Sequence, residues 1–401
     1  MTILILENLP YTACPLKQVF SATTEELVVL ASDHVKHTFD RKDYRYIEFF
    51  PNFISNDQVM LRAIELHQTY HFTSVIALQE YDLVRAAKLR EYLGIQGQSV
   101  ASVTEFRNKW IMKQKLRQND IPVAEMTLAQ TGLDIFRFAD QYDYPIVVKP
   151  IDGLGSVFTY VLHHREELEN FLAKEQFSEI LVEKYIEGDY FHVDGWVEDG
   201  VIQLITVSKY YNAPLASSSM TYLGSTMLHP QNPLSQRLAA GTKKVLEILD
   251  TPANTTFHAE WFHTPDDRII FGEIGSRTGG AKVSDAHKLA FDVSLFDIHA
   301  KISAGLPGPV LKGEMKMNPS HLAGWLLVNT KHGLLHVNSV LFPEWVKVAQ
   351  ITGEDGKSYD QAQLSVDSIA QFAFVGKNEE ELSRRLDQLI SIVDETFQWE
   401  N

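Results

Sequence analysis

The chain has 401 residues, which suggests two or three domains, because one domain usually takes roughly 100–200 residues. Hydrophobic residues make up 45% of the sequence and charged residues 22%, as in ordinary globular proteins, which excludes a disordered or fibrous chain. The net charge of −16 argues against a nucleic-acid partner, because a phosphate backbone would be repelled.

The cysteine content and the apolar segments predict a cytoplasmic protein without a membrane partner. Cys14 is the single cysteine and cannot form an intramolecular disulfide, which fits a reducing compartment. The opening residues MTILILENLP lack a basic segment and reach Asn8 and Pro10 too early for a secretion signal. No window approaches the roughly 18 apolar residues of a membrane span.

Short apolar runs alternate with helical patterns over residues 1–100. Strands are expected at 3–6, 26–31, 46–50 and 74–78, and Gly94 fits the residue that ends a helix. This alternation predicts an N-terminal α/β domain with a parallel sheet. No G-x-G-x-x-G pattern follows the first strand, so a dinucleotide-binding dehydrogenase loses its main support.

Residues 101–187 are assigned to a helix followed by a small central unit with a glycine loop. At Ser102 the sequence SVTE reads as a capping box, and a helical pattern continues to Asn119. The glycine loop DGLGS at 152–156 comes directly after an apolar strand that ends in Lys149. Further strands are expected within 121–129, 157–162 and 179–184, with a short helix at 133–141.

Residues 188–401 are assigned to a C-terminal domain of mixed α+β character. The dipeptide Asp199-Gly200 predicts a β-hairpin. Strands at 255–263 and 268–274 flank the turn TPDD, and a long helix is expected before them at 233–250. A final helix is expected at 378–397.

Glu260 and Glu273 are expected to face each other across the hairpin of 255–274. A turn centred between Asp266 and Asp267 pairs them when residues are counted outward along both strands. Like charges at ~4 Å repel by about 4 kcal/mol at an effective dielectric of ~20, so a cation should neutralise them. Two carboxylates suit Mg²⁺, with Mn²⁺ as a second choice. The same count gives two further pairs: His258 with Gly275, and Phe262 with Phe271.

Two alternatives to a ligand site stay open at this point. The glutamates could splay into solvent, and a register slip of one residue would remove their pairing. The glycine loop with Lys149 could be an ordinary turn beside a strand-end lysine, although successive main-chain N–H groups in such a loop can bind phosphate.

The order of these features resembles the ATP-grasp superfamily. The resemblance runs over roughly residues 75–305, and the N-terminal region looks like a pre-ATP-grasp domain. The sequence EIGSRTGG around Arg277 is similar to the same segment of L-amino-acid ligases, or dipeptide synthetases, and of carnosine-synthase-like carboxylate–amine ligases. The features that carry it are, in chain order, Lys109, Lys149 with the glycine loop, the segment 183–186, the acidic pair and Arg277.

The resemblance implies a role for each matching residue. The ATP-binding residues would be Lys109, Lys149, Gly153, Gly155, Ser156, Glu183, Lys184, Tyr185 and Ile186. The lysines and the loop would contact phosphates, and 183–186 would hold adenine through main-chain groups. Glu260 and Glu273 would bind Mg²⁺. Arg277 would face the acyl phosphate and Lys209 the terminal phosphate, which makes these two the catalytic residues.

Two positions depart from the family pattern. Gly275 stands where many members carry an Asn that helps to bind metal, so the metal would have one protein ligand fewer. Tyr190 stands where many members carry a ribose-binding acid, which leaves the ribose contact open.

Three further residues are candidates for binding substrate. Glu80 follows a parallel strand at the edge where ligands bind and could receive a substrate ammonium, although capping the next helix is the favoured alternative. Ser218 and Tyr222 belong to a polar stretch that either lines the substrate pocket or forms a surface loop. By contrast, His192 and Asp194 are interpreted as buried polar partners.

The resemblance implies an ATP-dependent carboxylate–amine ligase that joins L-amino acids through an acyl phosphate and yields a dipeptide, ADP and phosphate. Two alternatives stay open: a ligase that loads an amino acid onto a carrier-protein thiol, and a nucleotide-binding regulatory module without turnover. The expected partners are small-molecule amino acids, mildly favouring basic ones because of the negative charge. A carrier protein is expected only under the first alternative, and the oligomeric state, a homodimer included, stays open.

Overall fold

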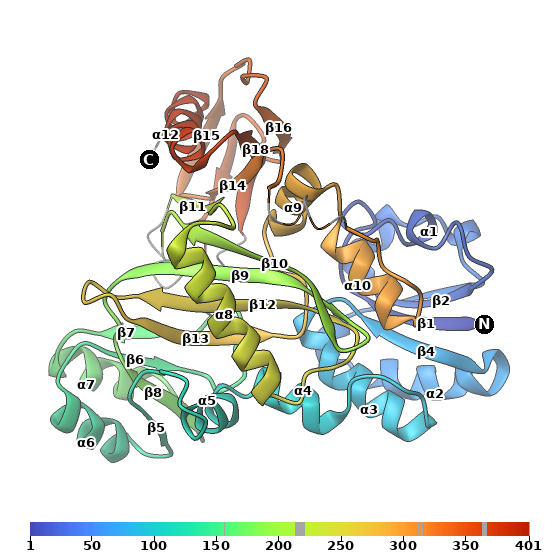
Figure 1. Cartoon of the computed structure of the whole chain (residues 1–401), viewed down its shortest axis with the longest axis horizontal. Coiled ribbons are helices and arrows are strands. Elements are labelled where there is room, and N and C mark those ends of the chain that lie inside the picture. The colour runs from blue at the N-terminus through green and yellow to red at the C-terminus, as the bar shows by residue number, and fades with distance from the viewer. Residues whose placement is uncertain are drawn as a thin grey trace.

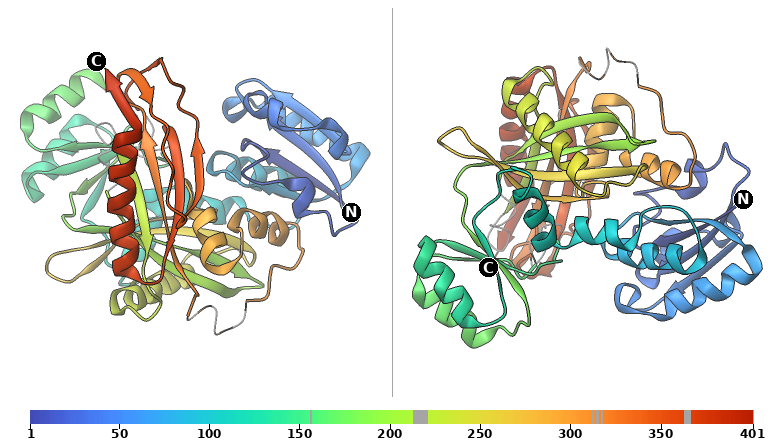
Figure 2. Two further views of the ribbon diagram at one scale, coloured as in Figure 1. Left: turned by 90° about the horizontal axis from the view of Figure 1, so that it is seen from above. Right: turned by 60° about the horizontal axis from the view of Figure 1, so that its bottom comes forward.

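The computed structural model describes residues 1–155, 157–212, 221–311, 313, 316, 318–362 and 367–400. Within these ranges the strands form four sheets, and an antiparallel sheet of eight strands lies in the middle of the molecule (Figure 1). In Figure 1 the parallel four-stranded sheet (blue) lies to the right of it, and a small four-stranded sheet (green) lies to its lower left. The two smaller sheets also lie apart from each other in Figure 2. This mixture of parallel and antiparallel layers confirms the predicted fold class.

The N-terminal region is the predicted parallel sheet, with strand order β3-β2-β1-β4. Both faces are covered by helices, because Leu4 and Val28 pack into one apolar core and Ile3 and Val29 into another. Burial on both faces explains why these strands read as continuous apolar runs. Gly94, with a φ of 70°, follows the last helix as predicted. The elements are β1 (Thr2–Glu7), α1 (Leu16–Val19), β2 (Glu26–Ser32), β3 (Tyr46–Phe50), α2 (Gln58–Tyr70), β4 (Phe72–Ala77) and α3 (Leu83–Leu93).

Two helices stand where the sequence predicted one. Ser99 caps the first, since its hydroxyl accepts a hydrogen bond from the N–H of Ser102, so the capping box predicted at Ser102 is wrong. Asn108 is extended and its side chain accepts hydrogen bonds from two N–H groups in the first turn of the second helix. The pair connects the N-terminal region to the centre of the molecule (Figure 2). The helices are α4 (Val100–Arg107) and α5 (Lys109–Arg117).

The small sheet has the strand order β5-β8-β6-β7, and all its pairs are antiparallel. Its apolar core includes side chains from both of its helices, such as Phe138 and Phe171. The loop between β6 and β7 contains the glycines of the predicted phosphate loop. The elements are β5 (Met126–Ala129), α6 (Gly132–Tyr142), β6 (Ile146–Lys149), β7 (Tyr160–Leu162), α7 (Arg165–Lys174) and β8 (Ile180–Lys184).

The eight-stranded sheet has the order β13-β12-β9-β10-β11-β14-β18-β16. The hairpin predicted at Asp199-Gly200 joins β9 to β10, with positive φ angles of 50° and 75° at the two residues. The elements of this part are β9 (Asp189–Glu198), β10 (Val201–Tyr210), β11 (Tyr222–Met227), α8 (Pro233–Ile248), β12 (Thr255–His263), β13 (Ile269–Gly275), α9 (Val283–Phe291), α10 (Leu295–Ser303), β14 (Leu322–Asn329), β16 (Val346–Ile351), β18 (Ser368–Gly376) and α12 (Glu379–Thr396).

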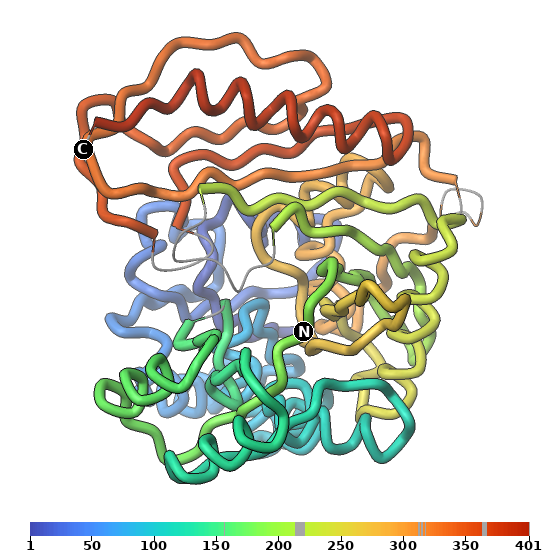
Figure 3. The backbone as a smooth tube through the Cα atoms, turned by 90° about the vertical axis from the view of Figure 1, so that its left-hand side faces the viewer, coloured from blue at the N-terminus to red at the C-terminus, as the bar shows by residue number. Residues whose placement is uncertain are grey.

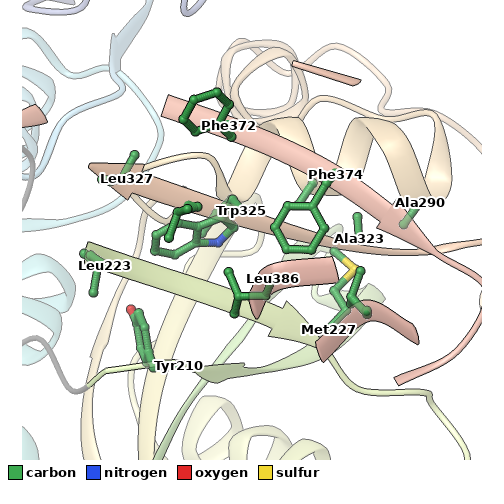
Figure 4. Close-up of a cluster of buried hydrophobic side chains, with 14 of the residues drawn as sticks. Tyr210, Leu223, Met227, Ala290, Ala323, Trp325, Leu327, Phe372, Phe374 and Leu386 are labelled. Carbon is green, nitrogen blue, oxygen red and sulfur yellow. The ribbon is translucent and has the colours of Figure 1, made fainter. Parts of the chain in front are cut away.

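Helices cover this sheet unevenly and leave part of it for the site. Helix α12 runs along β14 and β18 (Figure 3), and Leu386 of that helix joins the apolar cluster of Figure 4. Tyr210, Leu223 and Trp325 belong to the same cluster (Figure 4). A three-stranded sheet packs beside the end of α12 and contains β15 (Gly333–Val337), β17 (Lys357–Tyr359) and β19 (Phe397–Glu400). Among the described residues, no helix has both the length and the apolar character needed to cross a membrane.

Glu7, at the end of β1, is a buried carboxyl group whose pKa is raised. Glu7 is only 1% exposed. Its Oε1 accepts a hydrogen bond of 2.7 Å from the N–H of Leu9. Burial raises the pKa of Glu7 from 4.5 to about 8. Between these pH values the folded protein keeps a proton that the unfolded chain releases, so the free energy of unfolding falls as the pH rises.

We expect the free energy of unfolding of Glu7→Gln, relative to that of wild type, to increase as the pH rises. The glutamine keeps the acceptor oxygen and cannot ionise, so the difference in unfolding free energy should move in its favour by on the order of 4 kcal/mol between pH 4.5 and 8. Urea unfolding of both proteins at pH 5, 6.5 and 8 measures this. Parallel pH dependences of the two proteins would contradict the raised pKa.

Candidate active site

A cavity of about 360 Å³ lies where the three regions meet. One wall carries Glu80 and Arg107 from the N-terminal side, and another carries Lys149 with the glycine loop. The eight-stranded sheet forms the floor, where aromatic side chains such as Tyr210 and Trp325 line the cavity. Polar and charged groups from distant parts of the chain therefore converge on one enclosed space. Those groups are Glu80, Arg107, Lys109, Lys149, His258, Glu260, Glu273 and Arg277.

Glu260 on β12 and Glu273 on β13 are direct partners across the hairpin, which confirms the predicted pairing. His258 faces Gly275, also as predicted. The predicted Phe262–Phe271 pair is wrong, because the register shifts after Glu260 and Phe262 lies opposite Ile270 instead.

The acidic pair results from two offsets that cancel. The innermost pair, His263 with Ile269, centres the turn on Asp266 and not between Asp266 and Asp267. Gly272 is then left without a partner as a β-bulge, which restores the register at Glu273. A Cβ atom on Gly272 would lie 2.9 Å from the carbonyl oxygen of Glu260, so the bulge requires glycine at this position.

The carboxylate of Glu260 is contacted by three side chains that also line the cavity. Its Oε2 accepts a hydrogen bond from the hydroxyl of Tyr190, and its Oε1 accepts one of 3.4 Å from Tyr210. Nε2 of His258 lies 3.5 Å from Oε1. Burial alone would raise the pKa of Glu260, but the hydrogen bonds and the charges of His258 and Arg277 lower it below its usual value. Glu260 is therefore a fixed, ionised carboxylate at the cavity surface.

Lys109 connects the acidic pair to the glycine loop. Its Nζ donates a hydrogen bond of 2.5 Å to the carbonyl oxygen of Gly153 and lies 3.4 Å from Oε2 of Glu273. Gly153 and Gly155 both line the cavity, and Gly155 has a φ of 60°. Lys109 of α5 thus lies between Glu273 and the main chain of the glycine loop. The predicted Ser156 lies outside the described residues.

Lys149 and Glu183 belong to a buried ion triplet at the edge of the cavity. Nζ of Lys149 lies 2.7 Å from Oε2 of Glu183, and Lys113 binds Oε1. Burial would raise the pKa of Glu183, but the two lysines lower it to about 2. The side chain of Glu183 therefore fixes Lys149, which itself lines the cavity.

Arg277 reaches the cavity from the loop after β13 and is held by Glu80 from the N-terminal region. Its Nε donates to Oε2 of Glu80, and Nη1 of Arg107 donates to Oε1 at 2.7 Å. Burial would raise the pKa of Glu80, but the two guanidinium groups lower it to about 2. The predicted capping of the next helix by Glu80 is therefore wrong, because both of its oxygens bind arginine.

Gly275 leaves room for this ion pair. A Cβ atom there would lie 3.2 Å from Oε2 of Glu80 and 3.4 Å from Cγ of Arg277. An asparagine, the residue many ATP-grasp-like sequences carry at this position, would compete with Glu80 for the same space.

We expect Gly275→Asn to destabilise the protein by roughly 1–3 kcal/mol, because the added side chain overpacks the Glu80–Arg277 contact. Thermal unfolding of the variant measures this. Gly280→Asn is a matched control in the same loop, since a Cβ atom on Gly280 would meet nothing within 4 Å. Equal melting temperatures of the two variants would show that the space around Gly275 is not limiting.

Comparisons with known proteins identify the domain and the fold. Residues 142–285 match the family model of the ATP-grasp domain. The chain contains an ATP-grasp domain. It is 26% identical over 351 residues to the L-arginine-specific L-amino acid ligase of Bacillus subtilis, an alignment that covers 83% of this chain and 81% of that protein. The ATP-grasp chain is accordingly an ATP-dependent ligase that forms a C–N bond.

Solved structures show the same ATP-grasp fold over nearly the whole chain. An L-amino acid ligase from Bacillus licheniformis superposes with a TM-score of 0.78 at 17% identity, covering 100% of this chain and 99% of that one. A carboxyaminoimidazole ribonucleotide synthase from Aspergillus clavatus complexed with ATP gives a TM-score of 0.73 at 15% identity, covering 98% of both chains. At these identities the superpositions establish the fold alone.

Some predicted site residues of this ATP-grasp protein lie away from the cavity. Nζ of Lys209 lies 2.7 Å from Oδ2 of Asp189. Lys209 points away from the cavity, because adjacent residues on a strand point to opposite faces and its neighbour Tyr210 lines the cavity. Tyr222 donates its hydroxyl hydrogen to Asp394 on α12. Neither Lys209 nor Tyr222 lines the cavity. The predicted Ser218 lies outside the described residues.

The segment proposed to hold adenine also lies outside the lining of this cavity. The N–H of Lys184 donates 2.9 Å to the carbonyl of Glu125, and that of Tyr185 donates 3.2 Å to the carbonyl of Pro145. These two donors are engaged within the protein. Glu183 and Lys184 are the last two residues of β8, and Tyr185 and Ile186 follow the strand.

Sequence reasoning missed several groups of the site. His258 lies two residues before Glu260 on the same strand face, and this spacing could have identified it. Burial lowers the pKa of His258, but the charge of Asp194 outweighs burial and raises it to about 9. No sequence pattern identified Arg107 as a site residue. It is the last residue of α4, and it contacts Glu80 from the break between α4 and α5.

The residues present fit a divalent cation with a polyphosphate. Glu260 and Glu273 supply carboxylate oxygens, which hard cations prefer, and they face each other at the cavity surface. Lys109, Lys149 and the glycine loop supply positive charge and main-chain groups to the same cavity. The donor set is thus one of oxygen ligands for the metal and nitrogen donors for the anion.

Proposed function

We propose that this protein joins two L-amino acids into a dipeptide and converts ATP to ADP and phosphate. The observation that carries this proposal is the convergence of the Glu260–Glu273 pair, the lysine-flanked glycine loop and Arg277 on one cavity. The resemblance to amino acid ligases over most of the chain supports the same reaction class.

Glu260 and Glu273 would hold Mg²⁺, or Mn²⁺ in its place. When bound, the metal would neutralise charge on the phosphates and orient them. Lys109, Lys149, Gly153 and Gly155 would bind the phosphate chain, and the resemblance supports residues 183–186 as the adenine-binding segment. Phosphoryl transfer needs positioning and positive charge more than a covalent protein group, which suits this donor set.

The reaction we propose has two steps. A carboxylate oxygen of the first amino acid attacks the γ-phosphorus, the bond to ADP breaks, and an acyl phosphate forms. The amine of the second amino acid then attacks the acyl carbon, phosphate leaves with the bonding electrons, and the amine loses a proton. Arg277 would orient the carboxylate and donate hydrogen bonds to the oxygen on which negative charge develops. Glu80 would keep the guanidinium aimed into the cavity.

Phosphate release tests the proposal directly. The protein with ATP and Mg²⁺ is screened against the twenty amino acids, singly and in pairs, with mass spectrometry of the products. Arginine is the first choice, because a relative is named as arginine-specific and the negative charge favours basic substrates. Release together with a dipeptide mass is the expected result.

Two other outcomes would overturn the proposal. Release that requires a phosphopantetheinylated carrier protein would select thiol loading instead. Nucleotide binding without release under any combination would indicate a regulatory module.

A further inference from the structure

A cluster of buried polar side chains lies directly beside Glu260 on the cavity floor. It consists of His192, Asp194 and His258, and we call it the His–Asp cluster. One nitrogen or oxygen from each of these side chains lies within 4.8 Å of the others. None of the three residues is more than 7% exposed, and among them only His258 lines the cavity.

Strand register places the His–Asp cluster beside Glu260 on the same face of the sheet. On β9, Asp194 lies opposite His258 and His192 lies opposite Glu260 of β12. Side chains two residues apart on a strand share a face, so all four side chains lie on the cavity face of the sheet. The cluster therefore belongs to the layer that supports Glu260.

Asp194 fixes the orientation of both imidazoles. Its Oδ1 accepts a hydrogen bond of 2.8 Å from Nδ1 of His258, and its Oδ2 accepts one of 2.5 Å from Nδ1 of His192. Nε2 of His192 is bonded to the hydroxyl of Ser225 at 2.6 Å. Both carboxylate oxygens of Asp194 are thus occupied, and the cluster acts as a support rather than as a set of free ligands.

With Nδ1 bound to Asp194, His258 presents its other nitrogen to Glu260. The distance from Nε2 to Oε1 of Glu260 is 3.5 Å. The ring cannot turn without breaking the bond to Asp194. Carboxylates that bind a metal are themselves hydrogen-bonded by neighbouring groups, which fix their orientation.

The loop that carries Arg277 packs on the same bond. A Cβ atom on Gly279 would lie 2.7 Å from Oδ1 of Asp194 and 2.8 Å from Nδ1 of His258. The absence of a side chain at Gly279 lets the loop approach this closely. The Asp194–His258 contact therefore lies between Glu260 and the backbone that follows Arg277.

We infer that Asp194, acting through His258, positions the carboxylate of Glu260 to receive a divalent cation. Asp194 and His258 are then positioning residues and not catalytic residues. The inference rests on the proposed role of Glu260 as a metal ligand, so its test has to separate the two.

Direct binding of Mn²⁺ tests this inference without the ligation reaction. Free Mn²⁺ is measured by electron paramagnetic resonance in titrations of the full chain with a non-hydrolysable ATP analogue. Asp194→Asn keeps the size of the side chain, but its NH₂ group cannot accept a hydrogen bond from one of the two histidines. We expect a 10- to 100-fold weaker Mn²⁺ affinity. In assays, the Mg²⁺ concentration needed for half-maximal rate should rise while the rate at saturating Mg²⁺ largely recovers.

His299→Asn is the matched control. His299 is also a buried histidine, and its Nδ1 is bonded to Thr256 at 2.6 Å, but it does not line the cavity. Its Mn²⁺ affinity should stay within twofold of wild type. A similar loss in this variant would mean that any buried histidine change weakens the site, and would overturn the inference.

Two further variants keep the outcomes apart. If Asp194→Asn does not fold, His258→Gln breaks the same connection and is expected to weaken Mn²⁺ to a similar extent. Glu260→Gln is the reference for the metal site itself. If it binds Mn²⁺ like wild type, the proposed metal role fails. If it loses Mn²⁺ while folded Asp194→Asn or His258→Gln binds normally, only the positioning role fails.

Discussion

Replacing Arg277 with alanine should lower kcat/KM for amino acid ligation by two to three orders of magnitude. Arg277 is the guanidinium that enters the cavity beside the acidic pair, and the proposed reaction builds negative charge on an acyl oxygen. Loss of one such donor costs ~2.7–4 kcal/mol of transition-state stabilisation in other enzymes. Release of ADP under steady-state conditions with the best amino acid pair measures this effect.

Two controls show whether the loss is chemical. Nucleotide affinity should change little in Arg277→Ala, because the glycine loop and the lysines are untouched. Arg277→Lys should recover only part of the rate, since an ammonium cannot keep both the contact with Glu80 and a second donor in the cavity. A folded Arg277→Ala variant with turnover near that of wild type would remove Arg277 from the catalytic residues.

Glu273→Gln should lose most Mg²⁺-dependent ATP consumption, with a loss of at least ~100-fold at millimolar Mg²⁺. The glutamine removes one of the two opposed carboxylates, and a neutral amide is a weaker ligand for a hard cation. The free energy of unfolding without metal should change little, because the lost attraction to Lys109 offsets the lost repulsion from Glu260. A loss of metal dependence without a matching loss of metal-free stability is the signature to measure.

Glu105→Gln is the matched control for Glu273→Gln. Glu105 accepts a hydrogen bond of 2.7 Å from Lys115 and does not line the cavity. Its metal dependence should match wild type. If Glu273→Gln also kept an unchanged Mg²⁺ dependence, Glu273 would not be a metal ligand.

The sequence was sufficient for the elements whose patterns are local. Continuous apolar runs predicted the parallel sheet, and the Asp199-Gly200 turn predicted the β9–β10 hairpin. The acidic pair was also predicted, but its turn centre was wrong and the bulge at Gly272 was not foreseen. A bulge depends on close backbone packing against Glu260, which no local pattern encodes.

The remainder of the site depends on contacts between distant residues. Glu80 and Arg277 are 197 positions apart, and only the packing of the N-terminal region against the central sheet brings them together. Likewise, a strand pattern shows that Lys209 and Tyr210 point to opposite faces, but not which face borders the cavity. Asn108 was read as part of one helix, because a capping side chain inside a helical pattern gives a weak signal.

The contact between Glu80 and Arg277 also joins the N-terminal region to the central sheet. Glu80 belongs to the N-terminal region, whereas Arg277 follows β13 of the central sheet. Separating these two parts of the chain would part the Glu80 carboxylate from the Arg277 guanidinium. The cavity therefore has its full set of charged groups only while the N-terminal region packs against the central sheet.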